Sequence, residues 1–423
     1  MSAAQENITD RLYLGQHQVF SMDDQQTGLN NNVLVVGCSG SGKTMSVGEP
    51  LLLHATECSL VVSIVKRELL QKYTPLKTAQ GYRVLVLDTA QPEESTVGYD
   101  PLEQIADYED VPYLAQSIVE AGGSCPPLTD EIRYWNETAA HLLSAEMLFV
   151  MLTKEDATFA DVLAMHNHLE FDEAYGRLRT NYDEQFLYLE QQDPDCPAVR
   201  YYRAFCRLSS RTAGSVYGTL QTALQSVFTP GICRLTEKQP RLDFERLATE
   251  KTVLFIVTSP VNPAAHCFAN LMYGQMFKQL FEFGEQCPGG VLPVPVHLIA
   301  DDFAVSCRVP NFAAYTSVLR QKHISVTLML QSEAQLTALY GPLAAATIIN
   351  NCDSRVYMGG MQEREARNMA LRLGLPVRRV LELPVGQAIV VRRGQKPVIT
   401  ARYPITEDPL YRGTEDPLYR GNG

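Results

Sequence analysis

The stretch Gly37-Cys38-Ser39-Gly40-Ser41-Gly42-Lys43-Thr44 decides the fold of this chain. It fits the phosphate-loop pattern G-x-x-x-x-G-K-[ST], in which glycines turn the backbone tightly enough for several N–H groups to surround an anion. The apolar run Val33-Leu34-Val35-Val36 predicts a buried strand before it, and residues 45–56 predict a helix after it. Lys43 is then placed to pair with the β- and γ-phosphates of a nucleotide, and the Thr44 hydroxyl to ligate Mg²⁺.

Length and composition favour a large α/β protein. The chain has 423 residues, of which 45% are apolar and 20% charged, so a sizeable core is available. The formal net charge of -12 argues against a generally basic surface, so any nucleic acid would have to meet a local basic patch. The ten cysteines show neither a C-x-x-C pair nor zinc-site spacing, which indicates reduced thiols used as small apolar side chains.

Neither a secretory signal nor a membrane-spanning run is recognisable in this sequence. Residues 1–10 are polar and acidic, and the longest apolar candidate, residues 141–152, is interrupted by Glu146. A spanning helix needs about 18 apolar residues. We therefore expect a core helix at 141–152 and a cytoplasmic protein.

Strand and helix signals alternate in two parts of the chain, which predicts a mainly parallel, doubly wound sheet. Between these parts, residues 104–211 carry almost only helix signals and predict an all-α domain inserted into the α/β unit. The expected organisation is a nucleotide-binding domain in two parts, residues 1–103 and 212–405, with a flexible repeat tail at 406–423.

The tail contains Thr406-Glu-Asp-Pro-Leu-Tyr-Arg-Gly413 and an immediate second copy at residues 414–421. Two copies of eight residues are too short to build a repeat architecture. We interpret the repeat either as a disordered tail produced by duplication or as a tandem peptide ligand, for which bivalency would strengthen binding to a partner.

A second strand supplies the carboxylates that a phosphate loop requires. The largely apolar residues 296–300 end at Asp301-Asp302, which is a Walker B pattern. Asp301 is expected to hold Mg²⁺ through water, and Asp302 to polarise the attacking water as general base. The second position is usually Glu. Because Asp302 is one methylene shorter, either the water sits closer or hydrolysis is slow.

Two further polar residues fall near this expected site. Gln331 directly follows the next expected strand, residues 324–330, and is interpreted either as a γ-phosphate contact or as an ordinary strand-ending amide. Arg320 ends the helix between the two strands. We interpret it either as an arginine finger for the nucleotide of a neighbouring subunit or as a surface arginine.

Four arginines recur at steps of three and four, which predicts that they share one face of a helix. They are Arg200, Arg203, Arg207 and Arg211. In an acidic chain such a stripe is a candidate contact for a nucleic-acid backbone, and a solvated helix face is the alternative. His166 and His168, two residues apart, do not share a helix face, so they predict a polar helix end rather than a metal site.

Taken together, these motifs make the sequence similar to the conjugative coupling proteins of type IV secretion systems, which are RecA-like ATPases. The resemblance covers roughly residues 30–400. Besides the phosphate loop, it is carried by residues 30–37, Tyr99-Asp100-Pro101-Leu102, residues 134–139, Asp301-Asp302-Phe303, residues 330–336 with Tyr340-Gly341, and Asn351-Cys352. Of the family pattern D-P-K-G-E, the segment Ile64-Val65-Lys66-Arg67-Glu68 keeps only Lys66 and Glu68, and the family's N-terminal membrane helices are not found in this sequence.

The resemblance implies a RecA-like P-loop NTPase fold with an inserted helical domain, ATP and Mg²⁺ as cofactors, and assembly into homo-hexamers. It also implies delivery of DNA or a relaxase–DNA complex to a type IV secretion channel, with a membrane-anchoring partner. The resemblance would make this an ATPase whose site is complete in cis except for Arg320, which would act in trans. The alternative is a nucleotide-binding adaptor that recruits protein substrates with little or no hydrolysis, which Asp302 and the net charge of -12 favour.

Overall fold

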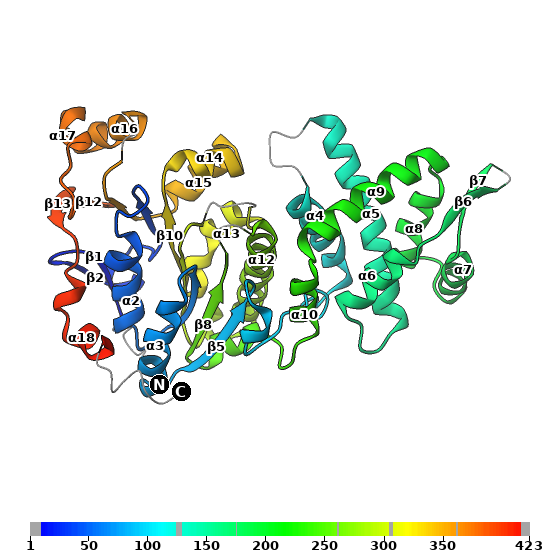
Figure 1. Ribbon diagram of the computed structural model, residues 1–423, viewed down its shortest axis with the longest axis horizontal. Coiled ribbons are helices and arrows are strands. Elements are labelled where there is room, and N and C mark those ends of the chain that lie inside the picture. Colours follow the sequence, from blue (N-terminus) through cyan, green and yellow to red (C-terminus); the bar gives the residue numbers. More distant parts are fainter. Residues whose placement is uncertain are drawn as a thin grey trace.

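A computed structural model of the chain describes residues 10–123, 129–174, 176–259, 262–303, 308–360 and 363–415. Its central sheet is built from β3 (Val33–Val36), β4 (Ser59–Ile64), β5 (Arg83–Asp88), β8 (Thr252–Val257), β9 (Val296–Ala300), β10 (Ile324–Leu330), β11 (Ser354–Tyr357), β12 (Gln387–Arg392) and β13 (Val398–Ala401). The strand order is β13-β12-β11-β3-β10-β9-β4-β8-β5 (Figure 1). All neighbours run parallel except at β12, which is antiparallel to β11 and β13. The predicted doubly wound α/β sheet is confirmed.

Helices cover both faces of this sheet, because alternate residues of its strands point to opposite sides. Val33 and Val35 belong to a core that includes α2 (Glu49–His54) and α3 (Arg67–Ala79). Leu34 and Val36 belong to a larger core that includes α12 (Pro263–Gln286), α13 (Phe312–Val318) and α15 (Pro342–Asn350). With both faces covered, β3 is buried along its whole length, which is why its sequence is continuously apolar.

A helical region forms the end of the molecule opposite β12 and β13 (Figure 1). It contains α4 (Val111–Gly122), α5 (Asp130–Thr153), α6 (Phe159–Asn167), α7 (Asp183–Gln192), α8 (Pro197–Cys206), α9 (Ser210–Val227) and α10 (Pro230–Glu237). The boundary expected at residue 211 falls inside α9, so the helical region extends beyond it. Its core is continuous with that of the sheet, since Phe268 of α12 lies against the rings of Phe228 and Tyr99.

A short antiparallel hairpin interrupts this region, where the sequence indicated only helices. It pairs β6 (Phe171–Ala174) with β7 (Arg177–Thr180). Each strand has four residues, of which only Leu178 is buried. Such short and polar strands carry too little alternation to be recognised from the sequence.

Asp100 joins the sheet to the helical region. Its carboxylate is fully buried and accepts hydrogen bonds from the backbone N–H of Leu102, at 2.8 Å, and of Phe159 at the start of α6, at 3.0 Å. The segment Tyr99–Leu102 therefore has a structural role: it ties the chain that follows β5 to the start of α6 in the helical region.

The long helix α5 contains the apolar run 141–152 and lies in the core, as expected. Its Glu146 is buried and lies 2.9 Å from Nδ1 of His166. His166 is thus a core residue rather than part of a polar helix end, while His168 is exposed. None of the helices in the described residues is both long and apolar enough to cross a bilayer.

The N-terminal segment packs against the sheet. A hairpin of β1 (Arg11–Gly15) and β2 (Gln18–Ser21) leads to α1 (Asp24–Thr27) and then to β3. The Asn32 side chain accepts a hydrogen bond from the N–H of Val326 in β10 and donates one to the carbonyl of Asn351, while the N–H of Asn30 donates to Asp353. These bonds hold the starts of β3, β10 and β11 in register.

The first copy of the tail repeat is folded onto the sheet domain rather than free. α18 (Pro409–Glu415) begins within it and runs two residues into the second copy, and Tyr411 is buried with Nζ of Lys72 at 3.1 Å from its ring centroid. Asp408 accepts a hydrogen bond at 2.7 Å from Tyr403 and lies 2.7 Å from Nε2 of His54. The expected flexible tail is therefore wrong for the first copy. Residues 416–421 of the second copy lie outside the described residues.

We predict that His297 in β9 makes stability depend on pH. Burial lowers its pKa from 6.5 to about 3, and its ring nitrogens lie 2.7 Å and 2.8 Å from the hydroxyls of Ser325 and Thr327. Below pH 6.5 the unfolded chain binds a proton that the folded chain does not, so stability falls as pH drops from 6.5 towards 3. Between pH 7.5 and 5.0 this histidine should cost about 2 kcal/mol.

Urea unfolding of the wild type and of His297→Gln at these two pH values measures the effect. The variant should lose less stability on acidification than the wild type. His168→Gln removes an exposed histidine and is the matched control. Equal pH dependence of all three proteins would contradict the prediction.

Candidate nucleotide-binding site

Three adjacent parallel strands bring the predicted site residues to one edge of the sheet. β10 lies between β3 and β9, so the residues that directly follow these strands, Gly37, Gln331 and Asp301, lie at their common carboxyl edge. In open α/β sheets this edge is where ligands bind. Gln331 consequently follows the strand that separates the phosphate loop from the acidic pair.

The phosphate loop has the backbone that its glycines predict. Gly40 and Gly42 adopt φ values of 73° and 78°, which strongly favour glycine. Residues 38–40 are exposed, whereas Lys43 is only 7% exposed. Its Nζ donates hydrogen bonds to the carbonyls of Gly37 at 2.8 Å and Cys38 at 3.3 Å, so the ammonium group is held inside the loop.

The helix after the loop begins with an unusual turn. Thr44–Gly48 is a π-helical turn, followed directly by α2, and the N–H of Glu49 donates to the carbonyl of Thr44. The helix expected at 45–56 therefore consists of two segments and ends at His54. Pro50 does not end the helix, although it lies within this continuous helical stretch, at the second residue of α2 and directly after the π turn. Single π turns of this kind are frequent at functional sites.

One hydrogen bond joins the phosphate loop to the residue that follows β9. The Thr44 hydroxyl donates to Oδ2 of Asp301 at 2.6 Å. Burial raises the pKa of the Asp301 carboxyl and the charge of Asp302 raises it further, while the bond from Thr44 and the charge of Lys43 lower it. A hydroxyl and a carboxylate are oxygen ligands of the kind that Mg²⁺ prefers.

No group of three or more His, Cys, Asp or Glu side chains that could hold a metal occurs in the described part of the chain. A magnesium ion at Thr44 and Asp301 would therefore take its remaining ligands from water and from a nucleotide. This is the usual arrangement for Mg²⁺, which keeps several waters and seldom has an all-protein cage. The residues present fit this cofactor.

Asp302 has a backbone conformation that is rare for its type. Its φ is 50°, in the left-handed region, and it directly follows Asp301 at the end of β9. Strained backbones of non-glycine residues cluster at active sites. His266 of α12 lies close enough for the charge of Asp302 to raise its pKa, although burial lowers that pKa more strongly. Sequence reasoning did not single out His266.

Gln335 fixes the backbone at Gln331. Its side-chain oxygen accepts hydrogen bonds from the N–H of Gln331 at 2.9 Å and of Ser332 at 3.4 Å. Ser332 and Gln335 form a capping box at the start of α14 (Glu333–Tyr340), and the Gln331 side chain is left exposed. The sequence analysis used Gln335 only as part of a motif, but Q-S-x-x-Q before an apolar helix is itself a capping signal.

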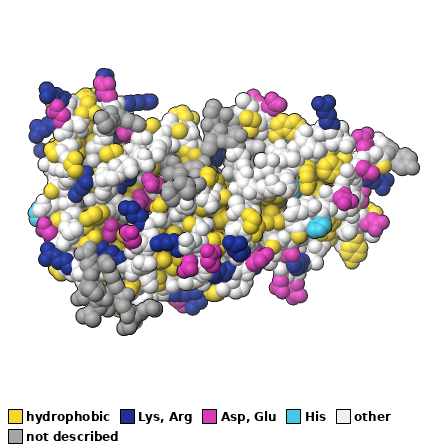
Figure 2. Space-filling view, in the orientation of Figure 1, with side chains coloured by type: hydrophobic (Ala, Val, Ile, Leu, Met, Phe, Trp, Pro, Cys, Tyr) yellow, Lys and Arg dark blue, Asp and Glu magenta, His cyan; other side chains and the backbone are white. Residues whose placement is uncertain are grey.

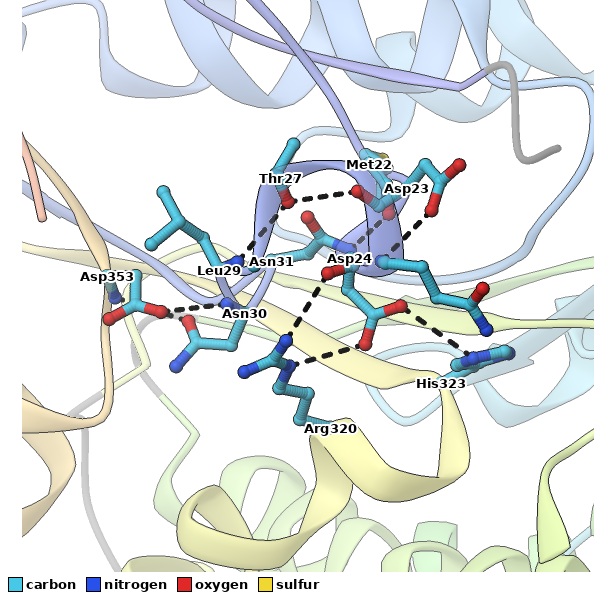
Figure 3. A network of polar contacts seen from close by, with 12 residues as sticks. Met22, Asp23, Asp24, Thr27, Leu29, Asn30, Asn31, Arg320, His323 and Asp353 are labelled. Carbon is cyan, nitrogen blue, oxygen red and sulfur yellow. Dashed lines mark hydrogen bonds and ion pairs between the residues drawn. The ribbon is translucent and has the colours of Figure 1, made fainter. Parts of the chain in front are cut away.

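Arg320 lies at the opposite edge of the sheet. It belongs to the 3-10 turn Leu319–Lys322, which precedes β10, and the seven residues of that strand place it about 23 Å from Gln331. Its guanidinium bonds to the carboxylate and to the backbone carbonyl of Asp24, both at 3.3 Å, and Nε2 of His323 lies 3.8 Å from the same carboxylate (Figure 3). Arg320 therefore cannot serve the phosphate loop of its own chain.

The arginine stripe does not lie on one helix. α8 ends at Cys206 and α9 begins at Ser210, so Arg207 lies just beyond α8 and Arg211 belongs to α9. All four arginines are exposed, and Arg203 forms an ion pair with Glu190. The regular spacing of the arginines gave no sign of the helix break at residues 207–209.

On the face shown in Figure 2, basic and acidic side chains are interspersed, and basic ones gather over α16 (Glu363–Leu373) and α17 (Val377–Leu381).

These features define the class of the protein. A phosphate loop after β3, an acidic pair after β9 and a glutamine after the strand between them are the arrangement of a RecA-like P-loop nucleotide-binding protein. The family model described as type IV secretory system conjugative DNA transfer matches residues 2–378. The chain therefore belongs to this family of conjugative DNA-transfer proteins of type IV secretion systems.

Solved structures show the same fold. The bacterial conjugative coupling protein TrwBΔN70, in complex with sulphate, is 17% identical with a TM-score of 0.68 over 95% of this chain and 90% of that one. Plasmid coupling protein TrwB with the non-hydrolysable ATP analogue ADPNP is 17% identical, with a TM-score of 0.66 over 88% and 84%. VirB4 of Thermoanaerobacter pseudethanolicus is 12% identical, with a TM-score of 0.58 over 97% and 100%. A comparison with curated proteins finds no match.

We predict that Gln335→Ala lowers the turnover number for ATP about tenfold without changing nucleotide affinity. The substitution removes the acceptor that holds the Gln331 backbone. The position from which the exposed Gln331 side chain extends is then no longer fixed. Because Ser332 remains as the N-cap, stability should fall by less than the roughly 1 kcal/mol that the loss of an N-cap costs. Steady-state hydrolysis and equilibrium binding of ATP separate the two effects.

Thr337→Ala on the same helix is the control, because its hydroxyl bonds only within the helix, to the carbonyl of Glu333. An unchanged turnover number in Gln335→Ala would show that the capping box has no part in positioning Gln331.

Proposed function

We propose that this protein binds Mg-ATP at residues 37–44 and hydrolyses it to drive DNA, or a relaxase–DNA complex, to a type IV secretion channel. The hydrogen bond between Thr44 and Asp301 carries the proposal, because it brings the two expected Mg²⁺ ligands together from distant parts of the chain. Membership of the conjugative DNA-transfer family supports the substrate. The binding of ADPNP, GDPNP, and ADP with Mg²⁺ by TrwB supports the cofactors.

Each residue of the site has a separate role in the proposed hydrolysis. Bound Mg²⁺ supplies charge that neutralises the developing negative charge on the phosphates. Lys43 binds the β- and γ-phosphates, and Thr44 and Asp301 hold the ion. Asp302 takes the proton of the attacking water, and Gln331, after the central strand, contacts the γ-phosphate.

Arg320 completes the site from a neighbouring subunit. It lies at the edge of the sheet opposite its own phosphate loop, and 41% of its side chain is exposed although it is paired with Asp24. A closed ring, for which we propose six subunits, would bring this edge of one subunit to the phosphate loop of the next. Arg320 would then stabilise the charge of the transition state in trans.

We place the protein in the cytoplasm, at the inner face of the membrane, where it would contact a secretion channel or a membrane-anchoring partner.

The exposed arginines of α8, α9 and the turn between them are the proposed DNA contact. They lie on the helical region, away from the nucleotide site (Figure 1). Phosphate contacts by arginine would make DNA binding weaken steeply with salt.

A second candidate function is a nucleotide-binding adaptor that recruits protein substrates and hydrolyses ATP slowly or not at all. The observation that favours it is Asp302, whose side chain is shorter than the usual Glu and whose backbone is held in the left-handed region. An adaptor would bind ATP tightly but show no response to DNA.

ATP hydrolysis with and without single- and double-stranded DNA separates the two functions. We expect DNA to raise the turnover number several-fold and Lys43→Ala to abolish hydrolysis, because the loop then lacks its phosphate-binding charge. Replacing Arg200, Arg207 and Arg211 by Gln should reduce the DNA stimulation and leave the basal rate unchanged. Tight ATP binding with no turnover under any condition would instead establish the adaptor.

Mixing two inactive variants tests the position of Arg320. Lys43→Ala and Arg320→Ala should each be inactive as pure proteins. If Arg320 acts in trans, mixed assemblies contain interfaces that pair an intact Lys43 with an intact Arg320, and part of the hydrolysis rate should return.

A mixture of Lys43→Ala with Asp302→Asn is the control for this rescue. Both changes damage the part of the site that each subunit supplies to its own nucleotide, so no subunit in this mixture has an intact site and the mixture should stay inactive. Absence of rescue in the mixture of Lys43→Ala with Arg320→Ala would argue against a role of Arg320 in the site of a neighbouring subunit.

A further inference from the structure

We propose that Arg402 is a nucleotide-binding residue, whose guanidinium binds the diphosphate part of the nucleotide from the flank of the phosphate loop opposite the Mg²⁺ ligands. This inference rests on the proposed function, since it needs a nucleotide in the loop. Neither β13 nor this arginine was among the features expected from the sequence.

The topology brings Arg402 to the right edge of the sheet. β11 runs parallel to β3, β12 is antiparallel to β11, and β13 is antiparallel to β12. β13 therefore runs in the same direction as β3. Arg402, the first residue after β13, lies at the same carboxyl edge as Gly37, the first residue after β3.

The guanidinium reaches the phosphate loop itself. A Cβ atom added to Gly42 would lie 3.2 Å from Nη1 of Arg402, so the arginine packs against the loop directly before Lys43. The arginine thus lies against the glycine-rich loop, where an anion would be surrounded by backbone N–H groups.

Within the described residues, the charge of Arg402 has no partner of its own. Nε is buried without a hydrogen-bond partner there, and no carboxylate among those residues pairs with the guanidinium. Burial lowers the pKa of Arg402. A cation that is partly removed from water without a counter-ion is costly unless an anion arrives. A phosphate group in the adjacent loop is such an anion, and arginine can bind it with two parallel hydrogen bonds.

The backbone holds Arg402 firmly in place. Its N–H donates to the carbonyl of Gly386 at 2.9 Å, and the preceding carbonyl, of Ala401, accepts from the N–H of Gln16 at 2.8 Å. The ring of Tyr403 lies edge-on to that of Tyr13, with 5.0 Å between the ring centroids. The arginine is therefore pre-positioned, and little conformational entropy is lost when a ligand binds.

The position of β13 in the sheet identifies the part of the nucleotide that Arg402 binds. Asp301 follows β9 and Gln331 follows β10, on one side of β3, whereas β13 lies on the other side. The γ-phosphate and Mg²⁺ belong on the side of Asp301 and Gln331. Arg402 approaches from the opposite side, so it should contact the phosphates that ATP and ADP share. Its contribution is then to binding in the ground state and not to the chemical step.

Equilibrium titration of the full chain with Mg-ADP and with a non-hydrolysable Mg-ATP analogue tests the inference. We expect Arg402→Gln to weaken the binding of both nucleotides at least tenfold and by the same factor. Arg402→Lys keeps the charge and should fall in between. Arg379→Gln, which removes an exposed arginine of α17, is the matched control and should bind like the wild type.

The melting temperatures of the nucleotide-free variants check that each one is folded. Unchanged affinities of folded Arg402→Gln would overturn the inference and leave the proposed function intact. A loss confined to the ATP analogue would overturn the diphosphate assignment. A wild-type chain that binds neither nucleotide would overturn the proposed function, and the inference with it.

Discussion

The hydrogen bond from Thr44 to Asp301 joins residues that are 257 positions apart, and the rest of the site depends on it. It exists only because β10, from a third part of the chain, separates β3 from β9 and keeps all three strands parallel. The asparagines before β3 secure that order by bonding to the starts of β10 and β11. A slip of one residue in this register would turn the alternating apolar side chains to the wrong faces and separate the hydroxyl from the carboxylate.

The helical region is joined to this site rather than appended to it. Its core runs without interruption into that of the sheet through α12, which also carries His266 close to Asp302. The buried carboxylate of Asp100 ties the segment after β5 to the start of α6 by accepting two backbone hydrogen bonds. Packed side chains therefore extend from the sheet that carries the acidic pair to the helices that carry the exposed arginines.

The charged residues illustrate how far spacing alone can mislead. Four arginines at helical intervals indicated one face, but a helix end at Cys206 places Arg211 on a different helix and Arg203 has an acidic partner. The histidines at 166 and 168 indicated a polar helix end, yet one is a core residue paired with Glu146. In the tail, a repeat that looked unstructured has its first copy packed on α3 through Tyr411. Glu190, Glu146 and Lys72 all lie outside the short stretches whose spacing suggested these structures, so the pattern within those stretches does not reveal them.

The sequence by itself determined the phosphate loop, the acidic strand end, the glutamine after its strand and the α/β class, because each of these is a local pattern of residue type and period. The tertiary structure alone decided which of these residues meet: Thr44 with Asp301, Gln335 with Gln331, and Arg320 with Asp24 instead of its own loop. It also revealed β13 and the arginine that this strand carries to Gly42. The physical reason is that strand order and direction are set by packing over the whole sheet, so neighbours across it are not encoded in any single stretch of chain.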